Sequence, residues 1–290
     1  MNLPKLSPYI KITRPELAFM DLTLPIACAF LAAFVGSGGF PDIFLFFKAI
    51  FGAYFAIIGS YVLNDFFDVD VDLINLPDRS LPSGELKKHN ALFFSILLYL
   101  LSILLFLSIN LESTLVVLLA IIIITSYSGY FKRKTPLSFV PVGLAYGLVP
   151  LGVWLAFSEI SLPVILFSLM IGITDLGFTN LDASRDVYGD KKSNIPTLPV
   201  TLGIPFVSKF VLVCWIIGII LSILIWYAAG LFYLYLACAI LSGAWYLARY
   251  REFLHNPTAR LGEKLFFNAS SYRGFLFVAL IIDIIVTYTF

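Results

Sequence analysis

The chain has 290 residues, of which 60% are hydrophobic and only 13% carry a charged side chain. Soluble domains contain about 25% charged residues, so this composition and a mean hydropathy of +0.95 exclude a soluble protein and predict an integral membrane protein. The formal net charge of +1 excludes a strongly basic protein, and we expect no nucleic-acid partner.

The apolar segments, taken in chain order, predict nine membrane-spanning helices. A helix needs ~20 mostly apolar residues to cross the hydrocarbon core of a bilayer. We place the spans at about residues 16–36, 43–63, 91–109, 113–131, 138–157, 161–181, 205–229, 231–248 and 273–290. The predicted fold class is therefore an all-α integral membrane protein, a bundle of nine transmembrane helices that forms one domain over residues 1–290.

The basic residues are distributed unequally between the two ends of these spans. Of the 19 Lys and Arg residues, Lys48 alone falls nearer the side opposite to the N-terminus, and residues as early as Lys5 follow this bias. Cytoplasmic loops carry an excess of Lys and Arg, so we expect the N-terminus to face the cytoplasm. The same rule places four long connections on that side: 64–90, 132–137, 182–204 and 249–272.

Two acidic clusters follow two of the expected spans. Both repeat a polar residue every four positions, with Asn64, Asp68 and Asp72 in the first cluster and Asp182, Asp186 and Asp190 in the second. On a helix, this spacing places the members of each cluster on one face. The clusters match at a constant offset of 118 positions, which predicts two pseudo-repeated halves, about residues 1–137 and 138–290, in one membrane orientation.

The clusters carry the oxygen ligands that hard divalent cations prefer. Carboxylates stacked on one face repel each other, and a bound cation would relieve that repulsion. No His or Cys lies nearby, so we expect Mg²⁺, with Mn²⁺ as the alternative. The candidate metal ligands are the members of the two clusters.

A Mg²⁺ site in a membrane protein also indicates the kind of substrate. Mg²⁺ keeps several waters and is usually completed by substrate phosphates, which predicts a phosphorylated, lipid-like substrate. Basic residues of the same-side connections could hold its phosphate oxygens, and the candidates are Arg79, Lys132, Arg133, Arg185 and Lys191. Aromatic faces stabilise cations, and we expect Tyr127 and Tyr188 to contact the substrate in this way.

The two acidic segments resemble the signature motifs of the UbiA superfamily of membrane prenyltransferases. The first reads Asn64-Asp65-x-x-Asp68-x-x-x-Asp72-x-x-Asn75-x-x-Asp78-Arg79-x-x-Pro82-x-Gly84. The second reads Asp182-x-x-x-Asp186-x-x-Gly189-Asp190, with Thr197-Leu198-Pro199 after it. Arg14-Pro15 and Tyr127-Ser128 also match family features, so the resemblance covers nearly the whole chain.

The resemblance implies an enzyme that transfers a polyprenyl group, such as geranylgeranyl, from its diphosphate to a lipophilic acceptor in the membrane. It implies a cavity open to lipid, with two Mg²⁺ ions that hold the diphosphate between the clusters. One ion would be served by the first cluster and the other by Asp186 and Asp190, while Asp182 would coordinate metal, or orient or deprotonate the acceptor. The expected catalytic residues are Asp68, Asp72, Asp182, Asp186 and Asp190, and the expected substrate contacts are Asn64, Arg79, Tyr127, Lys132, Arg185 and Tyr188.

The sequence leaves the acceptor open. The segment from Asn64 to Gly84 resembles the archaeal, lipid-forming branch of the family and favours a glycerol ether phosphate, although Ser80 stands where the family usually has proline. The alternative is an aromatic acceptor of the 4-hydroxybenzoate, dihydroxynaphthoate or tetrapyrrole type, as in quinone or pigment synthesis.

An alternative from another class is a cation transporter that uses the acids as ion ligands. Transporter sites normally lie near the bilayer midplane, whereas these clusters lie at the ends of the spans. Acids inside a membrane are functional candidates, and the sequence leaves the roles of three of them open: Asp21, Asp175 and Asp283.

Overall fold

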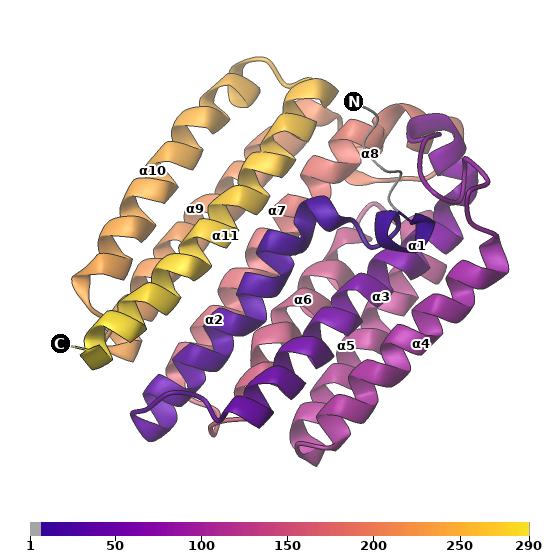
Figure 1. Cartoon of the computed structure of the whole chain (residues 1–290). Helices are drawn as coiled ribbons and strands as arrows, with labels where there is room; N and C mark the ends of the chain where they lie inside the picture. Colours follow the sequence, from indigo (N-terminus) through magenta and orange to yellow (C-terminus); the bar gives the residue numbers. More distant parts are fainter. Residues whose placement is uncertain (1–6, 290) are drawn as a thin grey trace, which may run out of the picture.

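The computed structural model describes residues 7–289, and every regular element in that range is helical. Lys5 and the last residue of the ninth expected span, Phe290, lie outside the described residues. Figure 1 shows the long helices packed side by side, with the short helices α1 (Pro8–Lys11) and α8 (Leu198–Leu202) at one end of the bundle and the C-terminus at the other.

The long helices follow the expected spans in chain order. Their bounds are α2 (Ala18–Ser37), α3 (Ile43–Asn75), α4 (Lys88–Leu107), α5 (Leu111–Gly129), α6 (Phe139–Trp154), α7 (Leu162–Lys192), α9 (Ile204–Ala229), α10 (Tyr233–His255) and α11 (Ala259–Thr289). Two 3₁₀ turns, η1 (Pro15–Leu17) and η2 (Phe131–Arg133), precede α2 and follow α5. Within the described residues, seven helical stretches are long and apolar enough to cross a membrane, and α6 is a shorter apolar helix. The chain is an all-helical membrane protein, and nine crossings stay a prediction.

α11 begins at Ala259, so helix fills most of the long connection expected at 249–272. α3 and α7 continue well past the ends of the spans expected for them. α3 has 33 residues and α7 has 31, which makes each of them roughly 45–50 Å long, against ~30 Å of hydrocarbon. Asp42 caps the start of α3, where its side chain accepts hydrogen bonds of 3.0 Å from the amides of Phe44 and Leu45. α3 ends at Asn75 because Leu76 precedes Pro77, and a residue before proline disfavours the helical conformation. The last turns of both helices carry the acidic clusters.

Glycines bring α6 into close contact with α7. A Cβ atom on Gly143 would lie 2.8 Å from the carbonyl oxygen of Gly172, and one on Gly147 would lie 3.1 Å from that of Ser168. Small residues four positions apart let helix backbones approach closely in a membrane, where close packing drives helix association. This contact holds the helix of the second cluster against the centre of the bundle.

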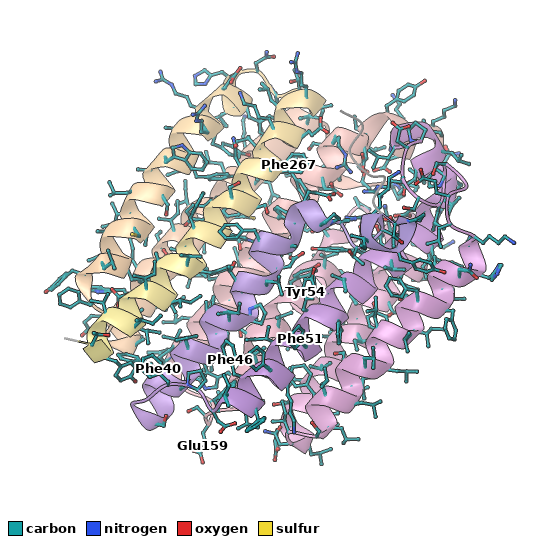
Figure 2. All side chains as sticks on the ribbon, in the orientation of Figure 1. Phe40, Phe46, Phe51, Tyr54, Glu159 and Phe267 are labelled. Carbon is teal, nitrogen blue, oxygen red and sulfur yellow. The ribbon has the colours of Figure 1, made fainter. Side chains whose placement is uncertain are left out.

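The outer surface of the bundle is covered by large apolar side chains. Phe47 and Phe51 of α3, Leu104 of α4 and Ile122 of α5 are all exposed. Figure 2 shows Phe51 and Tyr54 midway along the bundle, with Phe40, Phe46 and Glu159 towards one end and Phe267 towards the other. An apolar surface of this extent would be a liability in water, whereas it matches the hydrocarbon of a bilayer.

Candidate active site

The expected site residues come together at the end of the bundle that carries α1 and α8 (Figure 1). A cavity beside the clusters is lined by residues of η1 and the segment before it, α3, α5, α6, α7 and α11, among them Arg14, Tyr61, Asn64, Tyr127, Tyr146 and Asp182. An adjoining hollow is lined by Lys132, Asp186, Asp190 and Thr197. The two spaces share Tyr127, Thr179 and Asp182, so they form one continuous site between α3, α5, α6 and α7.

Basic side chains are interleaved with the first acidic cluster. Arg79 Nη1 lies 2.9 Å from Asp72 Oδ2 and 3.0 Å from Asp65 Oδ1. Lys132 Nζ donates a hydrogen bond to Asp68, whose carboxylate is only 2% exposed. The buried negative charge of this cluster is therefore balanced by bases from two separate connections, as a buried charge requires.

The second cluster is neutralised mainly by one of its own residues. Arg185 forms a two-pronged ion pair with Asp186, with Nε and Nη2 each 2.7 Å from a carboxylate oxygen. The same Nη2 atom lies 2.9 Å from Asp182 Oδ1. Asp190 accepts a hydrogen bond of 3.0 Å from the Thr197 hydroxyl, which belongs to the connection before α8. The planar guanidinium suits such paired contacts with carboxylates or phosphates.

Asp68, Asp72, Arg79 and Arg185 line neither space, but they join the site through their ion pairs. Tyr188 is the expected site residue that the structure leaves outside both the cavity and these ion pairs. Its side chain is 70% exposed, and it lines neither part of the site. The helix explains this outcome, because Tyr188 is two positions after Asp186 and so points about 200° away from it. Tyr127, by contrast, lines both spaces, close to Lys132.

Arg14 and Asp65 contribute to the site but were not among the expected site residues. Arg14 precedes η1 with a positive φ of 54°, and its Nη2 atom lies 2.8 Å from Asp65 Oδ1 and 3.4 Å from Asn64 Oδ1. Its guanidinium also stacks over the Tyr61 ring at 4.9 Å. In the sequence, the Arg14-Pro15 pair marked Arg14 and the first motif included Asp65, but neither observation predicted a role for these residues. Asp65 joins Arg14 to Arg79 at the centre of this network.

The carboxylates have the properties expected of metal ligands. Asp68 Oδ1 and Asp190 Oδ1 are buried and have no hydrogen-bond donor. In the helix ends beyond the expected spans, burial and neighbouring acids raise the pKa of Asp72 to about 6 and that of Asp190 to about 7. A divalent cation would compensate both the bare oxygens and the crowded charge, so the residues present fit Mg²⁺.

The fit depends on further ligands. Within residues 7–289, no three His, Cys, Asp or Glu side chains converge closely enough to hold a metal ion by themselves. Mg²⁺ is usually bound by one or two carboxylates together with substrate phosphates and water, so the arrangement suits a metal that arrives with a diphosphate.

The three acids within or near the spans have distinct environments. Asp21 is buried and accepts a hydrogen bond of 2.9 Å from the Tyr61 hydroxyl, which joins α2 to α3. Asp175 lines the cavity and forms a buried ion pair of 3.0 Å with Arg273 of α11. Asp283 accepts hydrogen bonds from the amides of Phe232 and Tyr235 and so caps the start of α10, which is a structural role.

A sequence model of the UbiA prenyltransferase family matches residues 25–272. This chain belongs to the UbiA prenyltransferase family. As a UbiA-family member it is a membrane prenyltransferase, and this conclusion replaces the cation-transporter alternative.

Relatives of this UbiA-family chain include two kinds of enzyme. It is 30% identical over 224 residues to digeranylgeranylglyceryl phosphate synthase of Methanosphaera stadtmanae, a match that covers 77% of this chain and 79% of the relative. It is 27% identical over 289 residues to protoheme IX farnesyltransferase of Cutibacterium acnes, covering 95% of this chain and 84% of the relative.

Solved structures show the same UbiA fold. A digeranylgeranylglyceryl phosphate synthase superimposes with a TM-score of 0.71 at 24% identity, covering 98% of this chain and 100% of that one. A UbiA homologue from Archaeoglobus fulgidus, bound to DMAPP and Mg²⁺, gives a TM-score of 0.64 at 21% identity, covering 94% and 99% of the two chains.

Proposed function

We propose that this UbiA-family protein transfers a polyprenyl group, such as geranylgeranyl, from its diphosphate to a glycerol ether phosphate in a Mg²⁺-dependent reaction. The observation that carries the proposal is the site itself. Buried carboxylate oxygens without donors and interleaved bases lie at a cavity lined by tyrosines. Such a site combines a binding place for metal and phosphate with a pocket for an apolar chain.

In the proposed site, each acidic cluster holds metal and the bases hold phosphate. Asn64, Asp68 and Asp72 would bind one Mg²⁺ ion, and Asp186 and Asp190 the other. When bound, Mg²⁺ neutralises the charge that develops on the departing diphosphate. Arg79, Lys132 and Arg185 then donate hydrogen bonds to the diphosphate oxygens, in a buried place where such donors are most effective.

The remaining residues of the site act on the prenyl group and the acceptor. The carbon–oxygen bond to the diphosphate breaks, and a new bond forms between that carbon and the acceptor oxygen. The acceptor hydroxyl loses its proton to the Asp182 carboxylate, which faces the cavity. The rings of Tyr61, Tyr127 and Tyr146 line the cavity, exclude water and offer π faces to the electron-poor carbon.

Two observations favour a glycerol ether phosphate as the acceptor. The relative with 30% identity is named for such a product, digeranylgeranylglyceryl phosphate. Arg14 also lines the cavity and could pair with the phosphate of the acceptor. The second candidate acceptor is a tetrapyrrole, because a protoheme IX farnesyltransferase matches 95% of the chain. Phenolic acceptors, such as 4-hydroxybenzoate, are a third arm of the test.

An acceptor screen in liposomes tests the proposal. The purified protein receives Mg²⁺ and radiolabelled geranylgeranyl diphosphate with geranylgeranylglyceryl phosphate, protohaem, 4-hydroxybenzoate or dihydroxynaphthoate. We expect a prenylated product and released pyrophosphate with the glycerol phosphate, and none after chelation of the metal. Turnover with another acceptor alone would refute the acceptor assignment. Turnover that persists in a chelator would refute the Mg²⁺ assignment.

We also propose that the protein lies in the cell membrane, with its N-terminus and the connections at the site facing the cytoplasm. The bias of Lys and Arg towards that side supports this orientation. Ser83→Cys in the connection after α3 and Glu159→Cys near the other end test it with a membrane-impermeant thiol reagent on intact cells. Glu159→Cys should react and Ser83→Cys should not, whereas the reverse pattern would invert the topology.

A further inference from the structure

Asn75, the last residue of α3, reaches across to the backbone of α7. Its Nδ2 atom donates a hydrogen bond of 3.0 Å to the carbonyl oxygen of Asp186. Its Oδ1 atom accepts a hydrogen bond of 2.9 Å from the amide of Gly189. The Asn75 side-chain amide is therefore hydrogen-bonded at both of its polar atoms to the turn of α7 that carries Asp186 and leads into Asp190.

These two hydrogen bonds connect the helices that carry the two acidic clusters. Within residues 7–289, they are the hydrogen bonds and ion pairs that join the side chains of α3 directly to α7. Arg79 and Lys132 pair with acids of α3, whereas Arg185 pairs with acids of its own helix. Because both clusters are negative, they repel each other, and a neutral amide that bonds both ways can hold them together.

Gly189 provides the space for this contact. A Cβ atom at this position would lie 2.4 Å from Asn75 Oδ1 and 2.5 Å from its Nδ2 atom. Gly189 lies inside α7 with ordinary helical backbone, where glycine is unfavourable by roughly 0.5–1 kcal/mol relative to alanine. The close approach of the Asn75 amide gives a reason for glycine at this buried point.

We propose that Asn75 is a positioning residue, which sets the separation of the two acidic clusters and thereby the binding of metal and diphosphate between them. The inference rests on the proposed function. Asn75 lies three residues after Asp72, about one turn further along the same side of α3. Its hydrogen bonds to the α7 backbone therefore hold the turn with Asp72 beside the turn with Asp186. Asn75 acts through the α7 backbone and does not itself contact substrate.

Binding of Mn²⁺ with inorganic pyrophosphate to the full chain in detergent tests this role without turnover. Mn²⁺ is followed by electron paramagnetic resonance, and unfolding temperatures are measured beside it. Asn75→Ala removes both bonds, and Asn75→Asp keeps the shape and the acceptor but loses the donor and adds a charge. We expect both variants to weaken Mn²⁺–pyrophosphate binding about 10- to 100-fold, as loss of a group that supports metal ligands does. Asn90→Ala, at the half-buried start of α4, is the control and should bind as the unmodified chain does.

Gly189→Ala separates positioning from general damage. Its methyl group should displace the Asn75 amide and weaken binding by a similar factor. In the Asn75→Ala background the methyl group has room, so the second substitution should add little. In turnover assays, the KM for Mg²⁺ should rise in Asn75→Ala, and excess Mg²⁺ should restore kcat, whereas a misfolded site would not be rescued.

The outcomes are distinguishable. If Asn75→Ala and Asn75→Asp bind Mn²⁺ and pyrophosphate like the unmodified chain, the positioning role is overturned and the proposed function stands. If the two Asn75 variants lose no more affinity than Asn90→Ala, or if the Gly189 and Asn75 effects add in full, the role is overturned as well. If the unmodified chain itself binds no Mn²⁺ with pyrophosphate, the proposed function fails and this inference fails with it.

Discussion

Lys132, in the turn that follows α5, donates a hydrogen bond to Asp68, the central acid of the first cluster. The lysine side chain is 14% exposed and the aspartate is 2% exposed, so the pair is shielded from solvent. The same carboxylate is a proposed metal ligand and the same ammonium a proposed diphosphate contact. In the proposed site, binding of metal and diphosphate would exchange this ion pair for two others, in which Lys132 contacts phosphate and Asp68 binds metal.

Lys132→Met should lower kcat about 100-fold or more, because it removes a donor aimed at the departing diphosphate. Binding of Mn²⁺ alone should not weaken, since the substitution leaves the Asp68 carboxylate free. Lys134→Met is the matched control, because Lys134 is exposed and two positions away. Equal kcat values for the two variants in the liposome assay would contradict the role of Lys132.

Asp68→Asn and Asp186→Asn should each lower turnover at least ~100-fold, because an amide is a much weaker ligand for Mg²⁺ than a carboxylate. Asp70→Asn, two positions after Asp68 on α3, is the control. Its carboxylate is 59% exposed and pairs with Arg133 at 2.7 Å, away from the cavity. Asp70→Asn should keep activity within about twofold, since exposed ion pairs contribute little. The readout is pyrophosphate release. Full activity in Asp68→Asn or Asp186→Asn would contradict the proposal that both clusters bind metal.

Tyr127→Leu should lower kcat about 10-fold, because the loss of a π face near an electron-poor carbon costs ~1–2 kcal/mol. Tyr188→Leu should keep kcat within about twofold, because the ring is 70% exposed and lines neither space of the site. The comparison uses one substitution on two tyrosines. A larger loss in Tyr188→Leu than in Tyr127→Leu would show that substrate reaches the outer face of α7.

Arg273→Met should destabilise the protein by about 3–5 kcal/mol, because it leaves the buried Asp175 carboxylate without its partner. Arg273 Nη2 also donates to the Thr174 hydroxyl at 2.6 Å, so two buried contacts are lost. The double variant Arg273→Met/Asp175→Leu should recover much of the unfolding temperature in detergent, since no unpaired charge is left. If the unfolding temperature falls further in the double variant, the unpaired Asp175 carboxylate is not the cause of the instability of Arg273→Met.

The sequence by itself determined the helices and the acidic residues of the site. A helix closes its hydrogen bonds within four residues, and an apolar run of sufficient length has few other ways to satisfy its backbone in a bilayer. The expected spans therefore fall on helices of the structure, although α3 and α7 continue about three turns beyond residues 63 and 181. The spacing of the acids already placed Asp68 and Asp72 on one face. The two pseudo-repeated halves stay a prediction.

The tertiary structure alone decided which side chains meet across helices. The contacts of Arg14 with Asp65, of Asp283 with the start of α10 and of Asn75 with the backbone of α7 join residues 51, 48 and 111 or more positions apart in the chain. Tyr188 shows the converse case, because a place inside a motif did not put its ring into the cavity. Such contacts depend on how each helix is rotated and packed against its neighbours, and no local pattern encodes that rotation. The acids could therefore be identified from the sequence, but the contact of Asn75 with α7, which we propose sets their separation, could not.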